Sequence, residues 1–405
     1  MTPKPRVAFV VQRCGYAVNG GAERHGLAIA IKMASVWNVD IVTTCATDHL
    51  TWANDYPPGD TLLERVTIRR FPVLRPRHMP SFNLHSRAIK ANSGRNTRAA
   101  EEAWMRAQGP WSPALLDFLT THRTAYDAFI FFTYLYATTY FGLPRVADRA
   151  FLVPTAHDEW PIHLSIFDDL FARPRGFVFN TIEERDFLRN RFPRVVFDGP
   201  IAGVAVSPPR RVDAERFRRR YGITAPFLIY VGRIDPQKGV RSLIDDFARY
   251  RESARARGRD IDLVLVGKPF MDLPPTGGVH AIGFVDDQTK WDAIAASSAL
   301  VMPSPLESLS LACLEAWSLT KPVIVNGACD VLVGQCRRSE GGLWYRDATE
   351  FATACDAVLR GKARAARLGE NGRAFTTKTY AWPVIVAAFQ DLLGCGQIDS
   401  RGSPT

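Results

Sequence analysis

The sequence contains no apolar run long enough to cross a membrane and no secretion leader. The uncharged stretch 128–144 is too short for a membrane span and carries five threonines and tyrosines before Tyr140. After Lys4 and Arg6, the apolar run 7–11 is too short for the hydrophobic region of a signal peptide. These absences predict a cytoplasmic protein and leave peripheral contact with the inner face of a membrane open.

The cysteines contain no C-x-x-C pair, which excludes the commonest spacing of zinc and redox sites. The seven cysteines are Cys14, Cys45, Cys313, Cys329, Cys336, Cys355 and Cys395. An odd, scattered set in a chain of this size predicts reduced thiols and no disulfide framework. Several of them lie in apolar runs, where cysteine behaves as a small buried hydrophobe.

The composition is that of a packed globular protein with more than one core. A chain of 405 residues that is 46% hydrophobic and 23% charged is expected to form two or three domains. The formal net charge of +10 favours anionic partners such as nucleotides, phospholipid surfaces or nucleic acid, and does not choose among them. The polar tail, residues 397–405, has no periodicity and is predicted to be disordered.

Short apolar runs alternate with helical patterns along the whole chain, which predicts parallel α/β sheets. The predicted strands are 6–11, 38–45, 66–73, 128–133, 150–154, 176–180, 227–231, 262–267, 279–283, 299–302 and 322–326. The predicted helices are 22–35, one opened by a capping box of Thr181 and Glu184, 240–251, 287–296, 308–319, 349–359 and 382–393. The segment 199–211, rich in proline, glycine and small residues, is the predicted linker.

This alternation divides the chain into two doubly wound, Rossmann-like domains. We expect an N-terminal domain of residues 1–204, a C-terminal domain of 205–378, a final helix over 379–396 and the tail 397–405. Ligands of such open sheets bind at the carboxyl ends of the strands, so two such domains are expected to face one cleft. The loops must then identify the reaction, because the fold alone does not.

Two glycine-containing segments follow predicted strands. Gly20 and Gly21 stand between the first strand and its helix, where backbone N–H groups can approach a ligand, although the pair also suits a plain tight turn. Gly232 opens the segment G-R-I-D-P-Q-K-G, in which Arg233 offers a planar fork for phosphate oxygens and Lys238 a movable point charge. A solvated basic turn is the alternative for this second segment.

The segment P-S-P-L-E-S-L-S-L-A-C-L-E, residues 303–315, is the sharpest pattern in the chain. A helix beginning near Ser308 would present free N–H groups and about half a positive charge to a pyrophosphate. Glu307 lies just before that start, and Glu315 lies two turns along, roughly 12 Å away. This distance suits the two ends of one nucleotide sugar, with Glu307 toward the sugar hydroxyls and Glu315 toward the ribose. The alternative is a capping Glu307 and a surface Glu315, although a carboxylate among apolar neighbours needs a partner.

His157 follows the predicted strand 150–154 in the sequence T-A-H-D-E-W and would face the ligand edge of the first sheet. It could hydrogen-bond a sugar or the leaving phosphate, or be a satisfied loop histidine.

These segments, in this order, resemble glycosyltransferase family 4, the retaining enzymes of the GT-B fold. G-G-A-E-R-H, H-D, G-R-I-D-P-Q-K-G and E-x7-E carry the resemblance, which covers residues 6–393. The family often has E-x-F-G where this chain has Glu307 followed by Ser308, Leu309 and Ser310, and the two serines can donate hydrogen bonds instead.

The resemblance implies that Arg233 and Lys238 neutralise the donor pyrophosphate, that Glu315 holds the ribose and Glu307 the donor sugar, and that His157 lies beside the reacting centre. The expected catalytic residues are His157 and Glu307. The expected donor-binding residues are Gly20, Gly21, Gly232, Arg233, Lys238, Ser308, Leu309, Ser310, Leu311 and Glu315.

The implied reaction is retaining hexosyl transfer from a nucleotide-diphosphate sugar (a GDP-mannose-like, UDP- or dTDP-sugar) to a glycan or lipid-linked saccharide, as in surface polysaccharide or lipopolysaccharide synthesis. No metal or cofactor is expected, since the cations and the helix terminus replace a metal, and D-x-D at 260–262 is interpreted as a strand entry. The alternatives are a sugar-nucleotide epimerase of GT-B fold and a non-catalytic relative that binds an anionic polymer. An oxidoreductase is disfavoured because G-x-G-x-x-G is absent.

The stretch 65–100 has nine basic residues and no acidic one. It suits an anionic membrane or a lipid-pyrophosphate acceptor, and equally a solvated basic loop. The residues expected to make this contact are Arg69, Arg70, Arg75, Arg77, Arg87 and Lys90. Nucleic acid is not an expected partner, because few aromatic residues accompany these charges.

Overall fold

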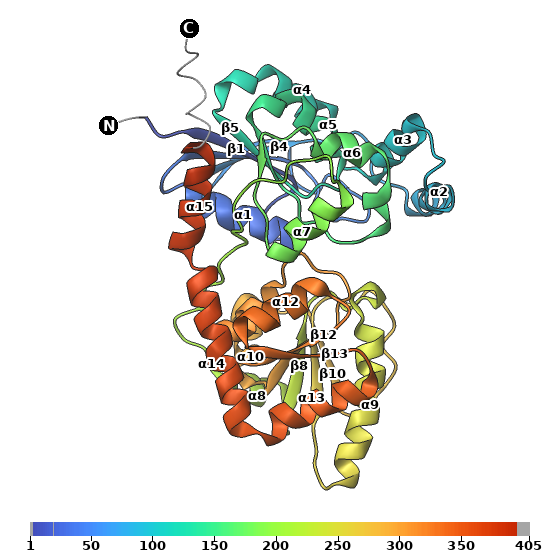
Figure 1. Cartoon of the computed structure of the whole chain (residues 1–405), viewed down its shortest axis with the longest axis vertical. Helices are drawn as coiled ribbons and strands as arrows, with labels where there is room; N and C mark the ends of the chain where they lie inside the picture. Colours follow the sequence, from blue (N-terminus) through green and yellow to red (C-terminus); the bar gives the residue numbers. More distant parts are fainter. Residues whose placement is uncertain (1–2, 19, 395–405) are drawn as a thin grey trace. The chain divides into compact units, whose positions relative to one another are not determined.

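The computed structural model describes residues 3–18 and 20–394, and the chain divides into two compact units (Figure 1). Unit 1 is the chain up to Val204 together with the part from Trp382 onward, and unit 2 is Ala205–Ala381. The tail 397–405 and Cys395 lie outside the described residues.

Unit 1 is built on a seven-stranded sheet, counted over the described residues. Its spatial order is β3 (Gly59–Leu63), β4 (Val66–Phe71), β2 (Asn38–Thr44), β1 (Arg6–Arg13), β5 (Ala128–Phe132), β6 (Ala150–Val153) and β7 (Gly176–Phe177). All neighbours are parallel except β3, which pairs antiparallel with β4 at the edge. β5 and residues 7–11 of β1 are apolar and buried, because helices cover both faces of a parallel sheet.

The helices of unit 1 include two that the sequence did not predict. The helices are α1 (Gly21–Met33), α2 (Met79–Ala91), α3 (Arg98–Gln108), α4 (Pro113–Thr121), α5 (Ala137–Gly142), α6 (Ile166–Phe171), α7 (Ile182–Arg191) and α15 (Trp382–Gly394), with short 3-10 turns η1 (Arg123–Ala125), η2 (Leu143–Arg149) and η3 (Trp160–His163). Beyond the predicted strand at its start, the alternative of a solvated basic loop for 65–100 does not hold, since α2 and the start of α3 occupy much of this stretch. Thr97 caps α3, and Trp104 packs on Phe82 of α2 with ring centroids 6.3 Å apart.

Unit 2 carries an all-parallel, six-stranded sheet within its described residues. Its spatial order is β10 (Val279–Gly283), β9 (Asp262–Val266), β8 (Phe227–Val231), β11 (Ala299–Met302), β12 (Val323–Asn326) and β13 (Gly342–Tyr345). Its helices are α8 (Ala214–Tyr221), η4 (Pro236–Lys238), α9 (Val240–Ala256), α10 (Asp287–Ala296), α11 (Leu311–Ser318), α12 (Asp330–Ser339), α13 (Ala348–Arg360) and α14 (Lys362–Thr379). The predicted α/β class with two parallel sheets is confirmed.

The last described helix, α15, belongs to unit 1 although the chain reaches it from unit 2. It buries Ile385, Phe389 and Leu392, which lie on one face at spacings of four and three residues. It lies beside α1 (Figure 1), where the Lys32 ammonium is 5.8 Å from the ring centroid of Trp382.

His25 on α1 ties that helix to the end of unit 1. Its Nε2 lies 2.9 Å from the carbonyl oxygen of Gly203, and its ring packs edge-on against Phe132 with centroids 5.2 Å apart. Complete burial lowers the pKa of His25 from 6.5 to about 4. The ring is therefore neutral at physiological pH and donates Nε2–H to Gly203.

Acidification should destabilise unit 1 through His25. The contribution of the neutral ring is fully present above pH 6.5, the ordinary pKa, and is lost as the pH falls toward the folded value of about 4. The loss at pH 5 is about 2 kcal/mol. Urea unfolding at pH 7.5 and pH 5.0 should show that His25→Gln loses less stability on acidification than the parent protein by this amount. An equal loss in both proteins would contradict the assignment.

Candidate functional site

Unit 2 brings two of the predicted segments together at one edge of its sheet. The strands β8 and β11 are parallel neighbours, so the segments that follow them, 232–239 and 303–310, leave the sheet on the same side. Gly239 has a φ of 74°, and a Cβ atom there would lie 2.4 Å from the carbonyl oxygen of Pro303. Only glycine fits this position, and the two segments are in direct contact.

An ion pair joins the two segments. The Lys238 ammonium donates a hydrogen bond to Oε1 of Glu307 over 2.7 Å. The side chains are 27% and 14% exposed, so the pair is reachable from solvent and its net worth is on the order of 1 kcal/mol. Each partner can therefore exchange the other for a ligand group of the matching charge at little cost.

Tyr230 holds the start of the same segment. Its hydroxyl donates to the carbonyl oxygen of Arg233 over 2.6 Å, and a Cβ atom on Gly232, whose φ is 155°, would lie 2.7 Å from that hydroxyl. Burial raises the pKa of Tyr230 well above its usual range, the carboxylate of Glu307 raises it further and the Arg233 guanidinium opposes them. Gly232, Arg233, Lys238 and Glu307 thus form one neighbourhood, as their spacing in the sequence suggested.

The helix after Glu307 begins later than predicted. It starts at Leu311, and Ser310 is its N-cap, whose hydroxyl accepts from the backbone N–H of Cys313. Ser308 and Leu309 precede the helix, so the predicted start near Ser308 was wrong. Two prolines and two further serines make the segment turn before its backbone becomes helical, because serine competes for local hydrogen bonds. The N–H groups of the first turn therefore belong to Leu311 and the residues after it.

Glu315 has an ionic partner that the sequence did not reveal. Lys290 of α10 donates to Oε1 of Glu315, and the side chains are only 10% and 12% exposed. A carboxylate among apolar residues was expected to need a partner, and Lys290 is that partner. No local sequence motif indicates this pair, since 25 residues separate Lys290 from Glu315 and the two residues lie on different helices. The pair leaves Oε2 of Glu315 for a second hydrogen-bond donor.

Gly20 and Gly21 lie in unit 1, apart in the chain from the cluster of unit 2. Gly20 is the N-cap of α1, and a Cβ atom there would lie 2.0 Å from Oε2 of Glu23. Glu23 is buried and accepts from Arg13 over 2.7 Å and from Gln12 over 2.9 Å. Gly20 is therefore required by the packing of this charged pair, whereas Gly21 borders open space.

His157 follows β6 at the carboxyl edge of the sheet of unit 1, in a strained setting. Its Nδ1 lies 3.8 Å from Oε1 of Glu159, which accepts from the Tyr134 hydroxyl over 2.8 Å. Thr133 and Thr155, at the ends of β5 and β6, have φ values of 65° and 50° and share a 2.7 Å hydroxyl contact. Left-handed backbone at β-branched residues costs free energy and is typical of functional sites. The sequence showed no sign of these two threonines.

Glu184 positions the segment that carries His157. Its two carboxylate oxygens accept from the backbone N–H groups of Ala156 and Asn180, each over 2.7 Å. Burial raises the pKa of Glu184 to about 8. The backbone N–H groups favour the charged form and lower this pKa, but their effect is smaller than that of burial. The predicted capping box is present in that Thr181 caps α7 by accepting from the N–H of Glu184. The carboxylate additionally fastens the chain directly before His157.

The six basic residues of the predicted membrane or acceptor contact have different surroundings. Arg69 pairs with Asp40 and Asp60, and Arg70 is buried against Thr61 and the ring of Tyr56. The guanidinium of Arg77 donates hydrogen bonds to backbone carbonyl oxygens. Three of the six are exposed and make no hydrogen bond or ion pair with side chains of the described residues, namely Arg75, Arg87 and Lys90.

Asp260 and Asp262 of the D-x-D sequence both lie beside the Arg251 guanidinium, at 3.2 and 3.7 Å. Over residues 3–18 and 20–394, no cluster of three or more metal-binding side chains is found. Across the same residues, none of the helices combines the length and the apolar character that crossing a bilayer requires.

Breaking the Lys290–Glu315 pair should destabilise unit 2 strongly. Lys290→Met leaves a nearly buried carboxylate uncompensated, which costs about 3 kcal/mol. Glu315→Gln in the same background removes the charge and should restore most of that loss. Urea unfolding of both single variants and the double variant gives the coupling free energy. Additive single effects, with no coupling, would show that the two side chains do not interact.

Part of the chain resembles known sequences. Residues 213–375 match the family model described as "Glycosyl transferases group 1". A stretch of 205 residues is 27% identical to the MMP alpha-(1->4)-mannosyltransferase of Mycolicibacterium hassiacum and covers 45% of this chain and 48% of that relative. A stretch of 125 residues is 31% identical to the alpha-D-kanosaminyltransferase of Streptomyces kanamyceticus and covers 27% of this chain and 31% of that relative. The chain thus spans less than half the length of these curated relatives.

Solved structures resemble almost the whole chain. The sucrose-phosphate synthase of Thermosynechococcus elongatus has a TM-score of 0.73 at 17% identity, covering 98% of this chain and 100% of that chain. Anabaena HepE in complex with UDP-glucose has a TM-score of 0.68 at 17% identity, covering 96% and 100%. WaaG, a glycosyltransferase involved in lipopolysaccharide biosynthesis, has a TM-score of 0.62 at 17% identity, covering 96% and 99%. The chain therefore has the GT-B fold, and its residues 213–375, which hold the Lys238–Glu307 pair, match the group 1 glycosyl transferases.

Proposed function

We propose that the protein is a retaining hexosyltransferase that moves a sugar from a nucleotide-diphosphate donor to a glycan or lipid-linked saccharide. The observation that carries the proposal is the exchangeable Lys238–Glu307 pair, formed by two segments that leave neighbouring strands at the ligand edge of unit 2. The match of residues 213–375 to glycosyl transferases group 1, and the glycosyltransferase names of both curated relatives, support it.

The charges of unit 2 suit the parts of a nucleotide sugar. Arg233 and Lys238 would contact the diphosphate, which would also meet the backbone N–H groups of Leu311 and Ala312 at the start of α11. Glu307, released from Lys238 by the incoming phosphate, would accept from hydroxyls of the donor sugar. Oε2 of Glu315 would accept from the ribose, while the contact of Lys290 with Oε1 orients that carboxylate.

The same charges favour the departure of the nucleotide. Negative charge grows on the diphosphate as the glycosidic bond breaks, and cations already in place stabilise that transition state more than the ground state. The acceptor hydroxyl would attack from the face that the diphosphate leaves and pass its proton to the departing phosphate oxygen, so the anomeric configuration is retained. This scheme uses no metal ion. His157, on the ligand edge of unit 1, would hydrogen-bond the acceptor.

The relatives suggest donors and acceptors to test. Their names refer to a mannosyl and an aminosugar transfer, and HepE is described in complex with UDP-glucose. GDP-mannose, UDP-glucose and dTDP-sugars are therefore the first donors, and surface glycans such as lipopolysaccharide the first acceptors. The net charge of +10 would attract the protein to an anionic membrane surface as a peripheral enzyme, by long-range electrostatics and without an apolar docking face.

Nucleotide diphosphates should raise the melting temperature, and one base should do so most. Arg233→Ala and Lys238→Ala should each weaken the dissociation constant of that nucleotide at least ten-fold, because each removes a charge-assisted hydrogen bond to phosphate. Arg249→Ala, which removes a 72% exposed arginine of the same unit, is the control and should bind unchanged. Undiminished turnover of a donor by Arg233→Ala would contradict the scheme.

The product distinguishes the proposal from its alternatives. Proton NMR of a reaction with donor and acceptor should show an anomeric coupling of the same configuration as in the donor. Conversion of the nucleotide sugar without any acceptor would indicate an epimerase. Failure of every nucleotide diphosphate to bind would indicate a non-catalytic relative.

A further inference from the structure

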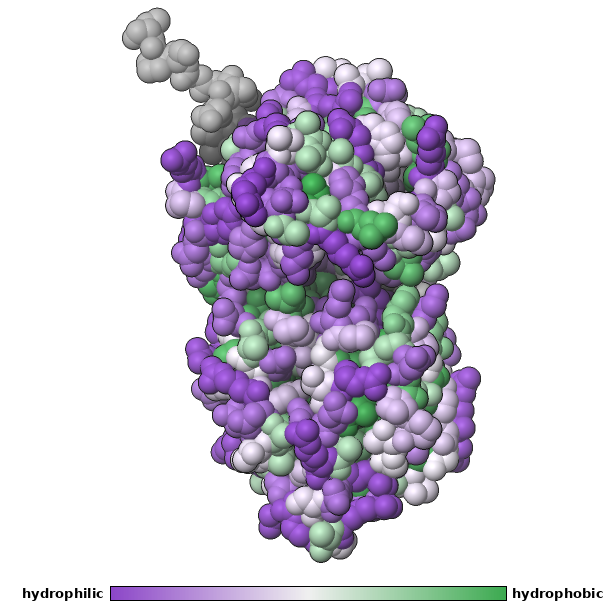
Figure 2. All heavy atoms as spheres, turned by 90° about the vertical axis from the view of Figure 1, so that its right-hand side faces the viewer, coloured by the Kyte–Doolittle hydropathy of each residue, from purple (hydrophilic) through white to green (hydrophobic). Residues whose placement is uncertain are grey.

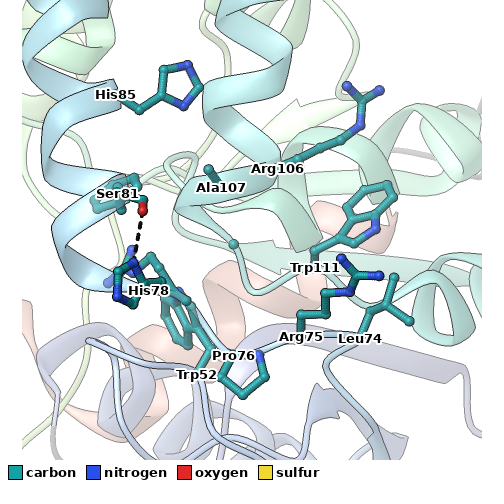
Figure 3. A pocket seen from close by; sticks show the side chains of 13 residues that line it. Trp52, Leu74, Arg75, Pro76, His78, Ser81, His85, Arg106, Ala107 and Trp111 are labelled. Carbon is teal, nitrogen blue, oxygen red and sulfur yellow. Dashed lines mark hydrogen bonds between the residues drawn. The ribbon is translucent and has the colours of Figure 1, made fainter.

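Unit 1 contains a cavity that the proposed donor chemistry does not use. Its volume is about 300 Å³, at the lower end of the range for ligand sites. It is lined by Trp52, Leu74, Arg75, Pro76, Arg77, His78, Ser81, Phe82, His85, Arg106, Ala107, Gly109 and Trp111, with no acidic residue among them. Figure 3 shows side chains of α2 on one side, with Arg75, Arg106 and Trp111 on the other and open space between them.

The cavity lies at the ligand edge of the sheet of unit 1. Its lining comes from segments that follow the carboxyl ends of β2 and β4. Trp52 packs edge-on against Tyr136, which follows β5, with ring centroids 5.3 Å apart. His157 follows β6 at this same edge, so cavity and histidine share the side of the sheet on which α/β proteins bind ligands.

The floor of the cavity is rigid. Trp52 is 1% exposed, has a φ of 57° and donates its indole N–H to the carbonyl oxygen of Gln108 over 2.8 Å. A Cβ atom on Gly109 would lie 3.0 Å from the Trp52 ring. A floor held in this way needs no rearrangement when a ligand enters, which lowers the cost of binding.

The cavity holds the positive charge of Arg77, which forms no ion pair within the described residues, although the carboxylate of Asp48 acts on it from further away. Arg77 donates to the backbone carbonyl oxygens of His49, Leu50 and Gln108. These neutral acceptors satisfy its N–H groups and leave its charge in place. Burial lowers the pKa of Arg77 to about 10, so it stays protonated at neutral pH.

Two further features of the lining favour an anion. Arg75 is exposed and has no hydrogen bond or ion pair with any described residue, so its planar fork is available. The N-terminus of α2 also opens onto the cavity at His78, and its first turn contains no acidic residue.

Apolar rings flank these charges. Phe82 and Trp111 are half-buried and border the same space as Arg75. Sugars present planar patches of C–H groups that pack on such rings, whereas a bare inorganic anion gains nothing from them.

The surroundings favour a soluble ligand over a bilayer. Leu74 and Leu84 are 61% and 65% exposed. On the side of unit 1 that bears α2 and α3, Figure 2 shows isolated hydrophobic side chains among hydrophilic ones and no continuous apolar surface. A membrane-docking face would require such a surface.

We propose that this cavity binds a phosphorylated saccharide, with the phosphate ester on Arg75 at the N-terminal end of α2 and the sugar ring against Trp111. This deepens the proposed function by naming the class of acceptor, and it rests on that function. The phosphate ester could belong to a free sugar phosphate or to an anionic lipid headgroup, and titration with free ligands and flotation with vesicles separate these sources.

Isothermal titration of the full chain with glucose 6-phosphate, glucose and inorganic phosphate tests the cavity. Glucose 6-phosphate should bind at least ten-fold more tightly than glucose or phosphate, because only it uses both the charge and the rings. Arg75→Ala should weaken its binding at least ten-fold, by loss of a charge-assisted contact. Arg87→Ala is the matched control, since it removes an exposed arginine of α2 that does not line the cavity, and it should bind within two-fold of the parent.

Flotation with phosphatidylglycerol and phosphatidylcholine vesicles supplies the lipid arm. Arg75-dependent binding of free glucose 6-phosphate supports the proposal whatever the vesicles show. Binding to phosphatidylglycerol vesicles that Arg75→Ala and Arg87→Ala weaken alike, with no binding of glucose 6-phosphate, overturns it in favour of a lipid surface. Inorganic phosphate binding as tightly as glucose 6-phosphate also overturns it.

Nucleotide binding separates this proposal from the proposed function. Arg75→Ala should bind the stabilising nucleoside diphosphate as the parent does, since Arg75 lies in unit 1 and the donor residues lie in unit 2. If the parent protein binds the nucleoside diphosphate but does not bind glucose 6-phosphate, the cavity proposal alone is refuted. Loss of nucleotide binding in Arg233→Ala, with sugar-phosphate binding intact, would support the donor site independently of the cavity.

Discussion

The ion pair between Lys238 and Glu307 is the contact on which the proposed chemistry of unit 2 depends. It forms because β8 and β11 are neighbours, which places the segments after them side by side, and because Gly239 lets the backbone reach Pro303. The pair stores a cation and an anion next to each other without burying either completely. In the proposed complex, the anionic diphosphate of a nucleotide sugar would pair with Lys238, and neutral sugar hydroxyls would donate hydrogen bonds to Glu307.

A second pair, Lys290 with Glu315, supports the first from a more buried position. It explains how an acidic side chain is tolerated on an apolar helix. In unit 1 the corresponding constraint is Glu184, which fastens the segment before His157 through backbone N–H groups. Both units thus use a carboxylate on a helix to fix a loop or a charge at the ligand edge of a parallel sheet.

Much of this organisation could be predicted from the sequence, because strand and helix periods and the glycine-rich exits are local signals. The segments around Lys238 and Glu307 were recognisable for that reason. The partner of Glu315 was not, since Lys290 is distant in sequence and only the packing of α10 on α11 brings them together. The start of α11 at Leu311 was missed because serines and prolines weaken the helical signal. The helices α2 and α3 were missed because the nine basic residues of 65–100 suggested a solvated loop, although Trp104 and Ile89 pack inward. The strained Thr133 and Thr155 follow from tertiary contacts that no local pattern encodes.

Hydrogen exchange of the full chain with and without a saturating nucleoside diphosphate tests the central claim most directly. If the Lys238–Glu307 neighbourhood is the donor seat, amides in 232–239 and 303–315 should become protected together, and Lys238→Ala should abolish that protection at the same nucleotide concentration. Protection confined to unit 1, or a bound nucleotide that leaves both segments exchanging as before, would contradict the account.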